Sequence, residues 1–343
     1  MELKLAGSRG GPGVDLENPR QCAAFLFGFM IFYMAIFRML SLLLTFSINL
    51  ISIVALSGEH GLDLSRVLLA FQPALFDGLE LFEQLRLLVC VIFSTSLTLY
   101  LAGTVSKIKP RYVFPSKRTP LPAAAAAVFL CTGFAFIGSW LGSLLEALAN
   151  LAGIKFYSEF IAPPVESAPA MVLFFLSLVL VPALFEEFLI RGLALSVTRR
   201  FGALFSVVLT SVMFALMHGT LTSMVQALFF SLAAGFVVMR FENVWITVCA
   251  HALVNLSSFV VNTVMQTQPS AVYADVLRIL TGVVFLLFIA ALVYSLLRHR
   301  QFFTGGYNLT DWGAVRVFLT SPVAIAFFVL CVFLIVVNTF MPL

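Results

Sequence analysis

Charged residues are scarce in this chain. Only 10% of its 343 residues are Asp, Glu, Lys or Arg, against about 25% in soluble globular proteins, whereas 61% are hydrophobic. So few charges cannot cover a water-exposed surface, which excludes a soluble enzyme, a disordered protein and a nucleic-acid-binding protein. The apolar residues, including 37 phenylalanines, fall in long runs. This pattern predicts an all-α, polytopic membrane protein embedded in a lipid bilayer.

Several motifs of metal sites and intramembrane proteases are also missing. The five cysteines are scattered through apolar runs without Cys-x-x-Cys spacing, so neither a disulfide framework nor a zinc ribbon is expected. There is no His-Glu-x-x-His motif of a zinc protease, and no predicted span contains the aspartates of an aspartyl protease. The many serines leave a serine protease open. No internal repeat is visible, which disfavours a transporter.

Apolar runs of near-spanning length divide the chain into transmembrane segments. Nine are expected, with an error of one: residues 22–56, 86–105, 122–148, 169–198, 203–218, 221–239, 244–263, 276–297 and 313–341. With the N-terminus inside, 13 of the 20 basic residues flank cytoplasmic ends and four flank the other side. The positive-inside rule therefore predicts a multi-pass protein, most simply of the cell membrane, with a cytoplasmic N-terminus. The acidic segment 57–85 then lies outside, as an interfacial helix or a loop.

Ionisable side chains at membrane depth are costly, and the few in this chain are therefore the functional candidates. One predicted span contains Glu186, Glu187 and Arg191, and the next ends at His218. A later span contains His251. Arg38, the one charged residue of the first span, is expected to reach the interface or to pair internally.

Helix geometry relates these groups to one another. His251 and Asn255 are four residues apart and share one helix face, as do Glu187 and Arg191. At about 1.5 Å per residue, Glu186 lies roughly 20 Å from Arg199, whereas His218 lies roughly 27 Å beyond Arg200. Their convergence therefore requires a tilt or a break near Gly202.

Three motifs in order resemble a known family. These are Glu186-Glu187-x-x-x-Arg191, Phe214-x-x-x-His218 and His251-x-x-x-Asn255. They resemble the motifs of the CAAX-protease and bacteriocin-processing family (CPBP, or Abi), which includes the Rce1-type CAAX prenyl endopeptidases. The resemblance covers roughly residues 168 to 260.

The resemblance implies an intramembrane endopeptidase that acts on a membrane-associated or lipidated peptide. It implies that Glu186 and His218 activate a water molecule and that His251 and Asn255 stabilise the oxyanion. The chemistry of the residues agrees, because a buried carboxylate against an imidazole can act as a general base, and Asn and His are suitable oxyanion donors. The domain organisation that follows is a polar cytoplasmic tail (1–21), N-terminal transmembrane helices with an interfacial segment (22–167), a catalytic core (168–263) and C-terminal transmembrane helices (264–343).

Two alternatives stay open. The same polar groups could bind helix to helix in a non-proteolytic membrane scaffold or regulator built on the same fold. Glu186, His218 and His251 could also hold zinc, with water in the fourth position; no other cofactor is expected.

Different roles are predicted for the two adjacent glutamates. Neighbours on a helix point about 100° apart, so Glu186 and Glu187 are not expected to face the same histidine pair. Glu187 is expected to pair with Arg191 and to support the helix structurally, while Glu186 is the chemical group.

Overall fold

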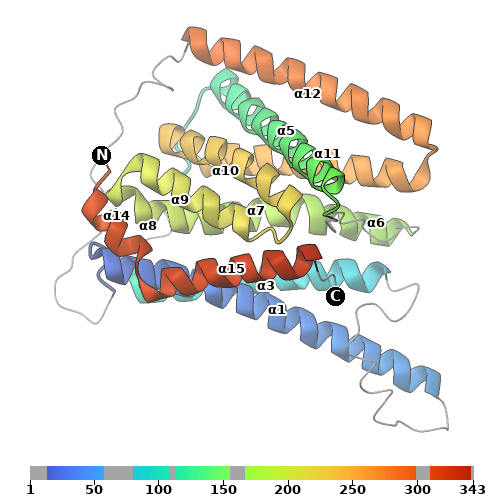
Figure 1. The fold of residues 1–343 in the computed structure, drawn as a ribbon, viewed down its shortest axis with the longest axis horizontal. Helices are drawn as coiled ribbons and strands as arrows, with labels where there is room; N and C mark the ends of the chain where they lie inside the picture. The colour runs from blue at the N-terminus through green and yellow to red at the C-terminus, as the bar shows by residue number, and fades with distance from the viewer. Residues whose placement is uncertain (1–13, 58–79, 109–112, 155–166, 299–309, 341–343) are drawn as a thin grey trace.

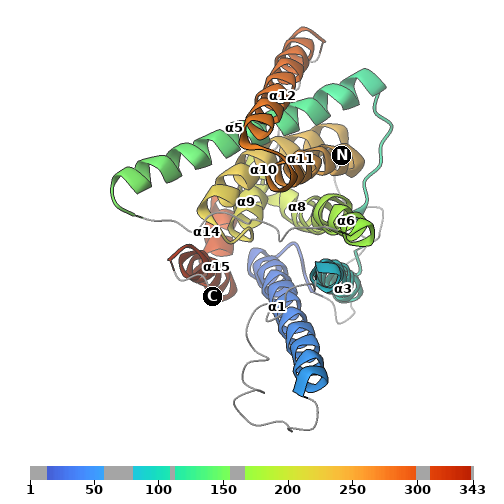
Figure 2. The same ribbon diagram turned by 90° about the vertical axis from the view of Figure 1, so that its right-hand side faces the viewer.

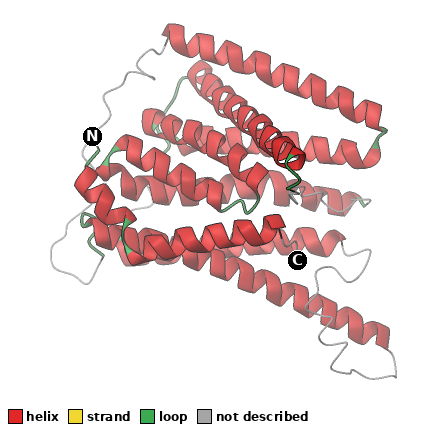
Figure 3. Ribbon diagram, viewed as in Figure 1, coloured by secondary structure: helices red, strands yellow, loops and turns green. Residues whose placement is uncertain are grey.

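The computed structural model describes residues 14–57, 80–108, 113–154, 167–298 and 310–340. All regular elements in these ranges are helices, and Figure 3 shows no strand in them. The acidic segment between the first two helices and most of the N-terminal tail lie outside the described residues. The helices are α1 (Pro19–Ser57), α3 (Glu80–Ser106), α5 (Leu121–Leu151), α6 (Ala168–Phe175), η2 (Leu176–Leu180), α7 (Val181–Glu187), η3 (Phe188–Ala194), α8 (Leu195–Thr198), η4 (Arg199–Phe201), α9 (Ala203–Leu216), α10 (Leu221–Phe241), α11 (Val244–Thr267), α12 (Ser270–Arg298), α14 (Trp312–Leu319) and α15 (Pro322–Phe340).

The helices stack in layers, as Figures 1 and 2 show. Helix α12 packs on α5, and α5 packs on α10 and α11. Helices α9 and the long segment from α6 to η4 lie beneath them, and α1, α3 and α15 form the opposite face. The predicted all-α membrane fold is confirmed, and helices from both ends of the chain pack against its middle part.

The described residues give fewer spans than the expected nine, and their upper count lies within the stated error of one. The described residues contain seven helices that are long and apolar enough to cross a membrane, or up to eight if the bent pair α14–α15 counts as one. Helix α9 has only 14 residues, about 21 Å at 1.5 Å per residue, and is too short to cross a hydrocarbon core of about 30 Å. The last predicted span bends by 61° before Pro322, because the residue before a proline is disfavoured in a helix.

Small residues allow the closest helix contacts. A Cβ atom added to Gly138 of α5 would lie 2.9 Å from the Cα of Gln226 and from the Cβ of Phe229 in α10. At Gly142, one turn further along α5, it would lie 3.0 Å from the Thr222 carbonyl oxygen. Small residues at such positions let helix backbones approach closely in membranes. These glycines therefore fix α5 against the helix that follows the predicted site residue His218.

The segment from α6 to η4 is one long span with two wide turns. Its π-helical turns, η2 and η3, lie on either side of α7, where the Val181 and Leu195 amides donate to the carbonyls five residues earlier, those of Leu176 and Ile190. Pro182 explains the first turn, since a proline lacks the N–H that an α-helix needs and clashes with the preceding turn. The seven residues of α7 carry both glutamates.

Candidate active site

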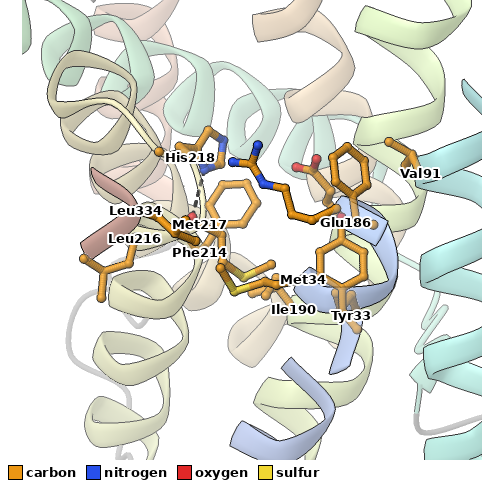
Figure 4. A pocket seen from close by; sticks show the side chains of 14 residues that line it. Tyr33, Met34, Val91, Glu186, Ile190, Phe214, Leu216, Met217, His218 and Leu334 are labelled. Carbon is orange, nitrogen blue, oxygen red and sulfur yellow. Dashed lines mark hydrogen bonds between the residues drawn. The ribbon is translucent and has the colours of Figure 1, made fainter. Parts of the chain in front are cut away.

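A cavity of about 240 Å³ lies between the N-terminal helix, the glutamate-bearing helix and the end of α9. Its lining is mostly apolar and comes from α1, α3, α7, η3, α9 and α15. The lining residues are Tyr33, Met34, Phe37, Arg38, Val91, Glu186, Leu189, Ile190, Phe214, Leu216, Met217, His218, Gly219 and Leu334. Two of the predicted site residues, Glu186 and His218, are thus brought to one cavity, and Figure 4 shows them on its opposite sides.

A break before α9 places His218 at the depth of Glu186. Gly202 has a φ of +127°, which L side chains rarely adopt, and it ends the long span so that α9 begins a new helix at Ala203. From Ala203 to His218 is about 22 Å at 1.5 Å per residue, close to the roughly 20 Å from Arg199 to Glu186. The predicted break near Gly202 is therefore present. His218 follows the end of α9 in a turn within the membrane, rather than the far end of a full span.

The backbone sets the tautomer of His218. Its Nδ1 lies 2.8 Å from the carbonyl oxygen of Phe214, and a carbonyl can only accept a hydrogen bond. Nδ1 therefore carries a proton, which leaves Nε2 of the neutral ring as the basic nitrogen. A histidine held this way at a cavity wall can accept a proton from a water molecule.

Behind the cavity, Glu187 and Arg191 form a buried ion pair. Arg191 Nη1 lies 2.9 Å from Glu187 Oε1, and the two side chains are 1% and 0% exposed. The guanidinium also lies over the rings of Phe214 and Phe230, 4.7 and 5.4 Å from their centroids. The predicted pairing of Glu187 with Arg191 is confirmed, and aromatic rings cover the cation as well.

His251 contacts both glutamates, which the sequence reasoning did not anticipate. Its Nδ1 lies 3.2 Å from Glu187 Oε1, and its Nε2 lies 3.9 Å from Glu186 Oε2. The prediction that the two glutamates do not face the same histidine pair holds only in part. His251 lies between the two carboxylates with one ring nitrogen toward each, whereas His218 shares the cavity with Glu186 and not with Glu187. Glu187 therefore touches both the arginine and the histidine, and it orients His251 toward Glu186.

Two other residues lie differently from the expectation. Asn255, one turn beyond His251 on α11, is half-buried and is not among the residues that line the cavity. Arg38 lines the cavity and makes no ion pair with any residue that the structure describes. Of the two expectations for Arg38, internal ion pairing is not found within the described residues, and reaching the interface stays a prediction. The position of Arg38 in the cavity could not be predicted from the sequence, because no motif links α1 to the glutamates.

The three predicted zinc ligands do not fit a metal site as placed. Within the described ranges, no group of three His, Cys, Asp or Glu side chains could hold a metal ion. Zinc content stays a prediction for the purified protein.

Comparison with known families agrees with the motif pattern. The family model described as type II CAAX prenyl endopeptidase Rce1-like matches residues 168–257. No curated protein and no solved structure matches the chain. The matched segment begins at α6 and ends in α11, so it includes Glu186, His218 and His251 but not the walls supplied by α1, α3 and α15. Residues 168–257 are therefore similar to the Rce1-like type II CAAX prenyl endopeptidases, the family that the three motifs resemble.

Proposed function

We propose that the protein is an intramembrane endopeptidase of the CAAX-prenyl-protease type. Its substrate is a membrane-associated or lipidated peptide, and a water molecule activated by Glu186 and His218 is the nucleophile. One observation supports this most: a carboxylate and an imidazole with its basic nitrogen free line the same apolar cavity. A cavity with apolar walls and few polar groups suits a lipid-modified peptide.

The reaction can be written with the residues of this chain. Water held between Glu186 and His218 gives a proton to this pair while its oxygen attacks the carbonyl carbon of the scissile bond. The C–N bond then breaks, and the leaving amine takes up that proton. In this proposal His251, with Asn255 one turn away, donates hydrogen bonds to the oxyanion that forms between these steps.

Glu187 and Arg191 act through His251. An imidazole that donates Nδ1–H to Glu187 can donate from Nε2 only when it is doubly protonated. Glu187 would stabilise that imidazolium, and Arg191 holds the carboxylate of Glu187 in place at 2.9 Å. We therefore assign Glu187 and Arg191 as positioning residues.

Glu186→Gln tests the proposal most directly. The side chain of Glu186 is 25% exposed and its nearest charged partner is a histidine at 3.9 Å, so the variant should keep the stability of the wild type. Loss of the general base should lower turnover about 10²- to 10⁴-fold. Cleavage of an S-prenylated cysteine peptide, with products identified by mass spectrometry in reconstituted vesicles, is the measurement.

Glu187→Gln is the matched control, since it changes the neighbouring carboxylate in the same way. It should reduce stability as well as turnover. If Glu187→Gln abolishes turnover in a stable protein while Glu186→Gln retains it, the two roles are reversed. If folded wild-type protein cleaves no peptide and Glu186→Gln cells match the wild type in every phenotype, the scaffold function replaces the peptidase.

A further inference from the structure

Arg38 is a cation without a counter-ion in the wall of the cavity. It lies 19 residues from each end of α1 (Pro19–Ser57), whose one other charged side chain, Arg20, is in the first turn. Three other described arginines do have such a partner: Arg191 and Arg278 each lie 2.9 Å from a carboxylate oxygen, and Arg86 pairs with Glu83. No described carboxylate lies within ion-pair distance of Arg38.

The position of Arg38 on α1 directs it to the cavity. Tyr33, Met34, Phe37 and Arg38 all line the cavity, and their three- and four-residue spacing places them on one face of the helix. Among the lining residues Arg38 is the only arginine or lysine and Glu186 the only carboxylate. The guanidinium therefore shares a largely apolar chamber with the proposed catalytic groups but is not neutralised by Glu186 within 4 Å.

An anion that enters this chamber would be bound strongly. Arg38 is exposed, and the cavity that it lines has mostly apolar walls. A charge-assisted hydrogen bond is stronger beside such walls than in bulk water. Arg38 shares its cavity with Glu186 and His218, so a peptide that reaches the proposed catalytic groups also reaches Arg38.

The proposed function supplies an anion of the right kind. A CAAX sequence carries its modified cysteine fourth from the C-terminus, with two aliphatic residues between it and the last residue. A cut beside that cysteine leaves the terminal carboxylate three residues away, about 10 Å in an extended chain. The apolar side chains of Met34, Phe37 and Val91 beside Arg38 suit the aliphatic residues.

We propose that Arg38 binds the C-terminal carboxylate of the peptide substrate, and so restricts the enzyme to bonds near a free C-terminus. This inference rests on the proposed peptidase function for the identity of the anion. It adds to that function a specificity-determining residue that lies outside the Rce1-like segment, 130 residues before its first residue, Ala168.

The test compares two S-prenylated peptides that are identical except for a C-terminal carboxylate or carboxamide. Cleavage by the full-length protein in vesicles should favour the carboxylate about 10- to 100-fold, the range expected for a hydrogen bond to a charged group. Arg38→Met should bring the ratio close to 1, and Arg38→Lys should restore part of it. Arg316→Met is the matched control, because Arg316 is an exposed arginine in an apolar helix that does not line the cavity, and it should leave the ratio unchanged.

A binding measurement separates this inference from the peptidase proposal. Glu186→Gln protein cannot turn over its substrate by the proposed reaction, so its affinity for the two peptides is measured directly, with and without Arg38→Met. A carboxylate preference that depends on Arg38 supports the inference even if wild-type protein cleaves neither peptide. Equal affinity for the two peptides, or a preference that survives Arg38→Met, overturns it even if cleavage is observed. An equal loss of cleavage for both peptides in Arg38→Met would also overturn it, since Arg38 would then act on the catalytic groups.

Discussion

Replacing Arg191 by methionine should destabilise the protein strongly. Methionine keeps most of the side-chain length but leaves Glu187 as a buried carboxylate whose remaining partner is His251 at 3.2 Å. Removing one member of a buried ion pair costs about 3–5 kcal/mol. The lost contacts of the guanidinium with the Phe214 and Phe230 rings should add about 0.5–1 kcal/mol each. The expected loss in the free energy of unfolding is therefore about 4–7 kcal/mol.

A second pair in the same chain provides the control. Arg278 and Asp275 lie at the same 2.9 Å, but their side chains are 77% and 67% exposed. Arg278→Met should therefore cost less than about 1 kcal/mol. Unfolding of the purified proteins in mixed micelles, followed by tryptophan fluorescence, gives both values. The double variant Glu187→Gln with Arg191→Met should lose less than the sum of its two single variants by about 0.5–3 kcal/mol.

Two results would contradict the buried ion pair of Glu187 and Arg191. If Arg191→Met loses no more stability than Arg278→Met, then the pair behind the cavity is not buried as described. Additive losses in the double variant would show instead that Glu187 and Arg191 act independently, and Arg191 would then not position Glu187.

Two further predictions concern helix packing and metal. Gly138→Ala should lower the free energy of unfolding by about 1–3 kcal/mol, because the added Cβ would lie 2.9 Å from the α10 backbone. The control is Gly282→Ala on α12, where the added Cβ meets nothing within 4 Å, so this variant should be neutral or stabilising by up to about 1 kcal/mol. The same unfolding assay compares the two variants, and equal effects would contradict the close α5–α10 contact. Since Glu186, His218 and His251 do not converge on a metal site, cleavage should resist chelators; stoichiometric zinc in purified protein, with activity lost on chelation and restored by zinc, would overturn the metal-free reaction.

The sequence predicted the helical elements well but not how far each one reaches. Every predicted span corresponds to a helix or a helix series, because long apolar runs in a bilayer have few alternatives. The number of spans is lower because α9, which begins at Ala203 after Gly202 as predicted, ends at Leu216 after 14 residues and is too short to cross the bilayer. Pro322 likewise breaks the last predicted run, 313–341, into two helices.

At the site, residue spacing predicted the contacts within one helix but not the contacts between helices. The four-residue step from Glu187 to Arg191 predicted their ion pair, since such a step fixes neighbours on any helix. The contact of His251 with both glutamates depends on how α11 crosses α7, and the presence of Arg38 in the cavity depends on where α1 docks. Neither crossing leaves a periodic signal in the chain, because lipid-facing and helix-facing residues are equally apolar.

The two π-helical turns beside α7 determine the direction in which the glutamate side chains point relative to the rest of the span. Each π-helical turn closes five residues back instead of four, so it behaves as one residue inserted into an α-helix. Deleting one residue from η2 would return that turn to α geometry and rotate α6 by about 100° relative to α7, without touching the bonds among Glu187, Arg191 and His251. Inserting or deleting one residue in a π-helical turn can therefore change which face of α6 meets the lipid without changing the direction of the carboxylates on α7. A substitution would not separate these two properties.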